Sequence, residues 1–534
     1  MSQVTEIKNK ESLLVDAKAG FIISLIALPL CLGIATASGF PPIAGLTTAI
    51  IGGIVVSWLG SSSFTIKGPA AGLIVIALGS VTELGQGDLT QGYHQALAVG
   101  VGAGVLQLIF ALMRTAGLGI CMSKSVVHGM LASIGVIIVA KQAHVMLGVT
   151  PHAHEALGLL AEIPHSFLDA NLAISLIGFA SLLILFFWPR ISSGFLKNIP
   201  AQLVVLLLAV PAAIIMHISA EGGSQFMGMS VKGGPGYMVS LPASVLDGIA
   251  HPDFSAFFTL TSIKYILMFA LVGTIESTLS VVAVDALKDY KRPSDLNRDL
   301  MAVSIGNIIA AFLGGLPMIS EIVRSKANVD AGAQSHRANF FHGCFLLIYL
   351  VALAGVIQLI PLAALAAMLV FTGLRLASVK EVVHAKQIGH DQMILFLVTL
   401  IVTLMTDLLV GVAVGLLVKI AIHWMRGVSP AALLKSKVTV AKEEGQWRMN
   451  IFDNAAFPCL LKVRSTLRQI EDRDTTVLID VTNARLVDHT FLSGLDVVFS
   501  ERPDLKRELV GLKKMKSVSD HPQSTRLHPG TAAR

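Results

Sequence analysis

Two short, interrupted hydrophobic segments hold the residues of this chain that are best suited to bind an anion. They cover 63–76 and 314–325 and occupy matching places in the two halves of the chain. Each places Gly and Pro just before an apolar run shorter than the roughly 20 residues that span a bilayer. Half-helices that meet in mid-membrane aim free N–H groups and positive dipole ends at one place. Paired broken segments are typical of secondary transporters, and this pair predicts an anionic substrate.

The predicted substrate-binding residues come mainly from these two segments. Gly68 and Pro69 could instead simply start a packed helix. Arg324 is costly at membrane depth unless it meets a partner or an anion, and we expect it to attract the anion at long range. The alternative is that Arg324 extends to the cytoplasmic surface. We expect the substrate to be bound by Gly68, Pro69, Ala70, Ala71, Ser320, Ile322, Val323, Arg324, Ser325 and Pro29.

Three further charged residues are candidates for coupling and electrostatic roles. Glu276 lies in an otherwise apolar segment, so it must be paired, protonated or facing water. A carboxylate near an anion site repels the substrate unless it binds H⁺ or Na⁺, which makes Glu276 the first coupling candidate and Glu321 the second. The alternatives are a structural hydrogen bond for Glu276 and a helix-dipole carboxylate for Glu321. Lys67 either raises the potential over the anion path or marks the cytoplasmic side.

Composition places the chain in a membrane. Of 534 residues, 54% are hydrophobic and 14% are charged, whereas a soluble domain carries about 25% charged residues. The net charge of +6 is spread over helix ends, which argues against a nucleic-acid partner. The four cysteines are widely separated and form neither a disulfide framework nor a metal motif, so we predict no metal site and no cofactor other than a coupling H⁺ or Na⁺.

Hydropathy predicts an all-α polytopic membrane protein with fourteen segments. Segments one to seven (repeat one, 16–218) and eight to fourteen (repeat two, 262–427) form two halves, and an odd-numbered repeat must insert with inverted topology. The third and tenth segments are the two half-helices. The segments lie near 17–38, 42–60, 68–82, 96–114, 124–142, 171–188, 200–218, 262–286, 299–314, 320–333, 339–358, 361–376, 391–407 and 409–426.

The loop charges orient the chain. Lys and Arg gather on the loops of one side, including the N-terminal segment 1–15, whereas the loops of the other side are mainly acidic. The positive-inside rule therefore puts both termini in the cytoplasm and predicts a multi-pass protein of the cell inner or plasma membrane. The transport domain covers 16–427. Beyond it, 437–515 reads as a small cytoplasmic α/β domain, and 516–534 lacks apolar periodicity and is expected to be disordered.

Several motifs in the right order resemble the SulP family of anion permeases over nearly the whole chain. The resemblance implies a seven-plus-seven inverted repeat, a core domain that moves against a gate domain, a C-terminal STAS domain and a homodimer. Two departures are Lys67 and Val323, where the family has a small polar residue and a serine. Asp488 and the shortened end make the STAS-like domain atypical. The matching residues are 27–30, 37–46, 68–72, 274–277, Pro317, Arg324, Asn328 and 406–412.

Three functions remain open from the sequence. The first is H⁺- or Na⁺-coupled uptake or exchange of a small inorganic oxyanion, bicarbonate or sulfate, by elevator-type alternating access. The second is a nucleobase–cation symporter of the same fold, which Glu276 and Glu321 would suit. The third is an anion channel or exchanger, or a scaffold that acts through its cytoplasmic domain. No nucleotide-binding loop, triad order or metal cluster indicates an enzyme.

Overall fold

The structure, a computed structural model, describes most of the chain. The described residues are 2–153, 155–194, 196, 199–221, 224–226, 229–231, 233–287, 294–429, 437–443, 446–470, 472, 474–500, 502 and 504–529. The chain divides into two compact units. The first comprises Met1–Ala116, Ile134–Lys288 and Ser294–Leu376, and the second comprises Gly117–Ser133, Asp289–Pro293 and Ala377–Arg534.

Helices make up nearly all of the first unit. Their apolar composition fits a bilayer or a neighbouring helix, and Gly and Pro interrupt them at the two broken segments. The larger elements are α1 (Ser2–Ala37), α2 (Pro42–Ile51), β1 (Ile66–Pro69), η2 (Ala71–Leu73), α4 (Ile74–Gly85), α5 (Leu89–Leu112), α6 (Lys124–Leu147, which begins in the second unit), α7 (Ala156–Leu168), α8 (Leu172–Ile191), α9 (Ala201–Ile215), α10 (Leu260–Leu287), α11 (Leu296–Phe312), β4 (Met318–Glu321), α12 (Ile322–Asp330), α13 (Arg337–Ala352) and α15 (Leu362–Leu376).

The membrane prediction agrees with the helices that the structure contains. Eight described helices are long and apolar enough to cross a membrane, and five further helices are shorter but apolar. Each of the fourteen predicted ranges overlaps a helix. Within the described part of the predicted transport domain, helices α7 and α16 (Val379–Ile388) lie outside the fourteen predicted segments. The chain is therefore a mostly helical membrane protein, while the count of fourteen crossings stays a prediction.

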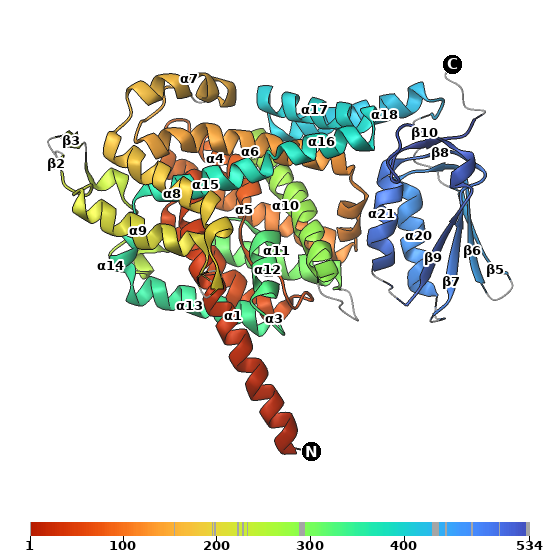
Figure 1. Ribbon diagram of the computed structural model, residues 1–534, viewed down its shortest axis with the longest axis horizontal. Coiled ribbons are helices and arrows are strands. Elements are labelled where there is room, and N and C mark those ends of the chain that lie inside the picture. The colour runs from red at the N-terminus through yellow and green to blue at the C-terminus, as the bar shows by residue number, and fades with distance from the viewer. Residues whose placement is uncertain are drawn as a thin grey trace. The chain divides into compact units, whose positions relative to one another are not determined.

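The two broken segments form short strands before their helices. β1 and β4 pair antiparallel, with Ile66 opposite Glu321 and Pro69 opposite Met318. The predicted half-helices at 68–82 and 320–333 therefore begin later than expected, at Ala71 and Ile322. In Figure 1, α10, α11 and α12 lie together in the first unit, and α10 contacts both β4 and α12. We call the paired strands β1 and β4 the ribbon.

The second unit combines helices and a sheet. Its helices before the sheet are α16, α17 (His390–Met405) and α18 (Leu408–Met425). The sheet runs in the order β10-β11-β8-β6-β7-β9, with β5 paired to β6. Helices α20 and α21 lie along this sheet in Figure 1, and this C-terminal domain fits a STAS-like fold. Its elements are β5 (Lys437–Glu443), β6 (Gln446–Ala455), α20 (Phe457–Gln469), β7 (Thr476–Asp480), β8 (Ala484–Val487), α21 (His489–Ser500), β9 (Lys506–Val510), β10 (Lys516–Ser517) and β11 (Arg526–Leu527).

The end of the chain differs from the expectation of a disordered tail over 516–534. Strands β10 and β11 pair with each other, and β11 adds to β8 as the next strand of the sheet. Two-residue strands are too short to show a periodic apolar pattern, so they could not be predicted from the sequence. The last five residues of the expected tail, 530–534, lie outside the described residues.

Candidate functional site

The ribbon brings the two broken segments into direct contact. Lys67 lies opposite Ser320, and Gly68 lies opposite Ile319. Successive side chains of a strand point to opposite faces, so Lys67 and Ser320 share one face of the ribbon and Gly68 faces the other way. Residues about 250 positions apart in sequence thus form one site. Pro29 is buried in α1, which contacts α12 and β1.

Both half-helices begin next to the ribbon without a side-chain cap. Ala70 precedes η2 and Glu321 precedes α12, and within the described part of the chain neither residue caps the helix with its side chain. The first N–H groups of a helix have no partner inside the helix, and the helix dipole makes this end positive. Two uncapped N-termini at one ribbon therefore offer donors and positive potential to an anion.

Arg324 lies inside the protein beside the ribbon rather than at a surface. Its side chain is 1% exposed. Its guanidinium donates to the Pro69 carbonyl and, over 3.4 Å, to the Cys31 sulfur, and it lies 3.8 Å from the Glu321 carboxylate. A Cβ atom at Gly68 would come within 2.8 Å of Arg324 Nη1. A side chain at position 68 would therefore displace the Arg324 guanidinium from its present place beside the first broken segment.

Glu276 lies against the first turn of the other half-helix. This α10 residue is 9% exposed, and its Oε1 atom has no hydrogen-bond partner among the residues that the structure describes. A Cβ atom at Gly72 would lie 2.1 Å from Glu276 Oε1. The second glycine of the segment 68–72 thus makes room for this carboxylate. The structural hydrogen bond that was the alternative for Glu276 Oε1 is not seen in the described chain.

The predicted serine ligands use their hydroxyl groups within the protein. Ser320 Oγ donates to Asp299 over 3.0 Å, and the Ser320 N–H donates to Ser277 Oγ over 3.2 Å. Ser325 Oγ accepts the Ile66 N–H at 2.8 Å and donates to the Glu321 carbonyl. Both hydroxyls thus hold the ribbon and its helices in place. As direct anion donors they are less suited than the sequence suggested.

The remaining predicted ligands divide between backbone and side-chain positions. Pro69 and Ala70 are buried, whereas the Ile322 and Val323 side chains are 44% and 43% exposed. Ile322 and Val323 begin α12, so these two residues would offer their N–H groups rather than their side chains. The structure brings Gly68, Pro69, Ala70, Ala71, Glu321 and Arg324 together around the ribbon. Their contact with an anion stays a prediction.

Lys67 forms an ion pair that was not predicted from the sequence. Its ammonium lies 3.1 Å from the Asp299 carboxylate of α11, and both side chains are 1% exposed. The positive charge that was expected to act over the anion path is therefore neutralised at short range. Asp299 carried no such signal as Glu276, since it follows Asp295 and Arg298 at a helix start and does not lie alone in an apolar run.

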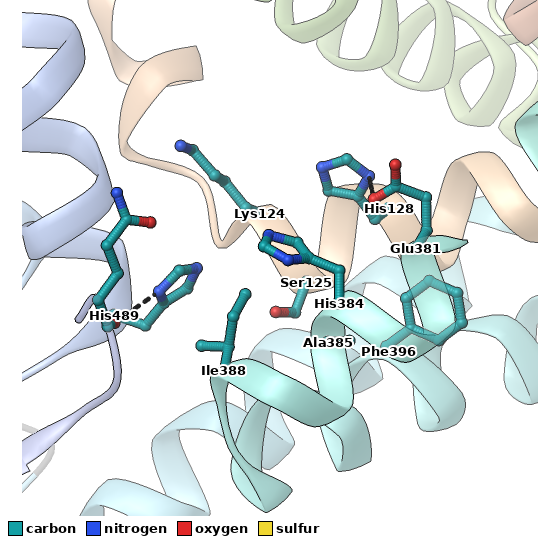
Figure 2. Close-up of a pocket in the computed structure, with 10 residues that line it drawn as sticks. Lys124, Ser125, His128, Glu381, His384, Ala385, Ile388, Phe396 and His489 are labelled. Carbon is teal, nitrogen blue, oxygen red and sulfur yellow. Dashed lines mark hydrogen bonds and ion pairs between the residues drawn. The ribbon is translucent and has the colours of Figure 1, made fainter. Parts of the chain in front are cut away.

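A separate pocket lies within the second unit, and none of the predicted site residues lines it. Figure 2 shows histidines of three elements around it: His128 of α6, His384 of α16 and His489 of α21. His128 Nδ1 lies 3.0 Å from Glu381, and His489 Nδ1 donates to the Gln523 carbonyl over 2.9 Å. Titratable side chains of the C-terminal domain, of the start of α6 and of α16 therefore line one pocket.

Comparisons with known proteins agree on one family. Residues 13–399 match the sulfate permease family. The candidate sulfate transporter YvdB of Bacillus subtilis is 28% identical over 71% of this chain and 68% of its own length. The bicarbonate transporter BicA of a Picosynechococcus strain is 24% identical over 66% of this chain and 59% of its own length.

Solved structures share the fold. The transmembrane domain of a cyanobacterial BicA has a TM-score of 0.64 at 22% identity, covering 75% of this chain and 97% of that one. The overall structure of SLC26A9 has a TM-score of 0.66 at 14% identity, covering 96% of this chain and 85% of that one. The chain therefore belongs to the sulfate permease family, a family of membrane anion transporters rather than enzymes.

Proposed function

We propose that this chain is a secondary active transporter of a small inorganic oxyanion, bicarbonate or sulfate. The observation that carries the proposal is the meeting of two uncapped helix N-termini at the ribbon, beside the buried Arg324. Backbone N–H groups and one guanidinium suit a compact anion with several acceptor oxygens. The named relatives are a candidate sulfate transporter and a bicarbonate transporter, which supports this substrate class. An elevator-type movement of the half-helices against the remaining helices would give alternating access.

The charges around the ribbon support coupling at Glu276. Lys67 pairs with Asp299, and Arg324 lies near Glu321. Glu276 is the remaining acid, and among the described residues it has no ion pair. A lone carboxylate inside a membrane protein is costly unless it binds a proton or a cation. Its neutral form would remove the repulsion that opposes anion entry, so one H⁺ or Na⁺ would travel with each anion.

The surroundings of Glu276 favour H⁺ over Na⁺ in this proposal. The hydroxyl of Thr274 is the nearby side-chain oxygen of α10 that also has no partner in the described chain. Two positions along a helix are separated by about 200° around its axis, so Thr274 and Glu276 do not share a face. A sodium ion needs several oxygen ligands at once, whereas a proton needs one.

Uptake into proteoliposomes tests the function and its coupling. Bicarbonate, sulfate, chloride, fumarate and uracil are compared under an imposed pH or Na⁺ gradient. We expect gradient-driven uptake of one oxyanion by the wild type. Glu276→Gln should transport without dependence on the gradient, and the control Glu83→Gln, at an exposed ion pair with Lys264, should behave as the wild type. Gradient dependence that survives in Glu276→Gln would remove the coupling role.

The same assay separates the alternatives. Uracil uptake would favour the nucleobase–cation symporter, in which Glu321 would have to bind the base although Arg324 lies 3.8 Å away. Flux that ignores every gradient would favour a channel or an exchanger. The proposal further places both termini in the cytoplasm and the protein in the membrane as a homodimer. Accessibility of a C-terminal tag and chemical cross-linking check these two points.

A further inference from the structure

The buried ion pair of Lys67 and Asp299 joins three parts of the first unit. Lys67 lies in β1, and Asp299 lies in the first turn of α11. Asp299 Oδ1 also accepts the N–H of Ser62 over 3.2 Å, while its Oδ2 accepts the hydroxyl of Ser320 over 3.0 Å. One carboxylate therefore holds the chain before β1, the middle of β1 and the facing residue of β4. Lys67 also donates to Thr65 Oγ1.

The pair lies on the face of the ribbon opposite to Arg324. Lys67 and Ser320 are cross-strand neighbours, and both contact Asp299. A side chain at the next residue, Gly68, would point at Arg324 instead. Lys67 therefore does not share the face on which Arg324 meets Pro69. Its ammonium is used by Asp299 and Thr65, so it is not offered to an anion in this arrangement.

Asp299 fits closely against its surroundings, which leaves the pair little freedom to rearrange. A Cβ atom at Gly60 would lie 3.0 Å from Asp299 Oδ1, and one at Gly52 would lie 2.6 Å from the Lys67 carbonyl. Closely packed protein interiors of this kind do not deform continuously. Removing one charge of the pair leaves the other buried without compensation, which is far more disruptive than removing both.

We propose that the Lys67–Asp299 pair, with Ser320 on its second oxygen, is a positioning element that fixes the register of the ribbon and thereby the spacing of the two helix N-termini. It acts on transport through geometry and does not bind the anion. A shift of β1 against β4 would move Ala70 and Ala71 away from Ile322 and Val323, and the donors would no longer converge. The inference rests on the proposed transport function.

The test is a double-mutant cycle read as anion KM and Vmax. The variants are Lys67→Met, Asp299→Asn and the double variant, in proteoliposomes at low and high ionic strength. We expect each single variant to raise the KM at least about tenfold at both ionic strengths, because each leaves one buried charge unpaired. The double variant keeps the side-chain sizes and should recover most of the affinity. Lys264→Met breaks an exposed pair of the same 3.1 Å length and serves as the matched control.

Asp299→Asn decides between positioning and direct attraction of the anion. If Lys67 acted by its charge, removing Asp299 would strengthen the positive potential and lower the KM, most clearly at low salt. An unchanged or lower KM in Asp299→Asn would overturn the inference and leave the proposed function intact. If that variant does not fold, Ser320→Ala replaces it, because it removes one contact of Asp299 and should raise the KM about threefold.

The outcomes for the inference and for the transport function are separable. A wild type that takes up no oxyanion would refute the transport function itself. The melting temperatures of the same four proteins then test the pair without transport. If the decreases in melting temperature of the two single variants add up in the double variant, Lys67 and Asp299 are not coupled. Recovery of the melting temperature in the double variant would support the link between the strands.

Discussion

At the scale of single residues, the site depends on two glycines that admit charged side chains. Gly68 lies where a Cβ atom would meet Arg324, and Gly72 lies where one would meet Glu276. The two positions are four residues apart, on either side of Pro69. The segment therefore leaves room for the side chains of one buried cation and one buried acid at the start of a half-helix. Glycine at these positions leaves space for the two charged side chains. Neither glycine has a backbone conformation that other residues rarely adopt.

Gly72→Ala should impair both stability and transport. The added methyl group would lie 2.1 Å from Glu276 Oε1, so the carboxylate or η2 must move. Overpacking of this kind costs about 1–3 kcal/mol of unfolding free energy. A thermal melt and the initial uptake rate measure the two effects. The melting loss should shrink in a Glu276→Ala background, because the clashing group is then absent.

The control for this substitution is Gly355→Ala, since a Cβ atom there meets no heavy atom within 4 Å among the described residues. That variant should melt at or slightly above the wild-type temperature, as expected for Gly to Ala in a helix. Equal effects of Gly72→Ala with and without Glu276 would show that the contact is unimportant.

At the scale of elements, hydropathy predicted the helices well and the connections poorly. All fourteen predicted ranges overlap helices because long apolar runs leave few alternatives in a bilayer. Helices α7 and α16 were missed because they are short and lie between the long apolar runs. The ribbon was also missed, since a four-residue strand that pairs with a distant partner has no local signal.

In the candidate site, too, some features could be predicted from the sequence and others could not. Glu276 and Arg324 could be found because a charge in an apolar run needs a partner. The ion pair of Lys67 could not, because its partner Asp299 is more than 200 positions away and sits among other charged residues at a helix start. Sequence indicates which side chains need a partner, and the fold decides which partner they meet.

Ser325→Ala should loosen the junction of the ribbon with α12. Ser325 Oγ accepts the Ile66 N–H at 2.8 Å, so its removal leaves a buried donor without a partner. Such a donor costs about 1–3 kcal/mol. Reduced hydrogen-exchange protection at Ile66 and a lower melting temperature are expected. Ser325→Thr keeps the hydroxyl and should retain protection.

Thr82→Ala is the control for Ser325→Ala, because the exposed Thr82 hydroxyl bonds only to carbonyls of its own helix in the described chain. Full protection at Ile66 in Ser325→Ala would mean that the N–H has another acceptor and that the serine does not support the ribbon.

At the scale of the whole molecule, the C-terminal domain adds titratable contacts to the second unit. Asp488 lies 3.0 Å from Lys419 and 3.6 Å from His423, both on α18. Burial alone would raise the pKa of the Asp488 carboxyl, but the charge of Lys419 and the nearby His423 hold it well below its usual range. The contribution of Asp488 to stability is therefore present above the unfolded pKa of about 4 and is lost only below it.

The histidines titrate in a different window from Asp488. Burial lowers the pKa of His489, although the Gln523 carbonyl and Asp488 act in the opposite direction. Burial and the nearby His384 lower the pKa of His521. A histidine in an unfolded segment has a pKa of about 6.5. Below that pH, the state in which these histidines are released from their contacts therefore binds protons that the folded state does not. Stability must then fall as the pH falls through this range.

Acidification from pH 7.5 to 5.5 should therefore loosen the end of the chain over 516–529. This segment docks through Ser519 Oγ, which donates to the Ile388 carbonyl over 2.6 Å, and Thr525 Oγ1, which donates to Asp391 over 2.9 Å. We expect amide protection factors, corrected for intrinsic exchange rates, to fall roughly three- to tenfold.

His489→Asn can still donate to Gln523 but cannot be protonated in this range, so it should lose much of the pH dependence. His165→Asn, at an exposed histidine, should not. An acid response that persists undiminished in His489→Asn would assign it to His521, whose ring lies 5.6 Å from that of His384.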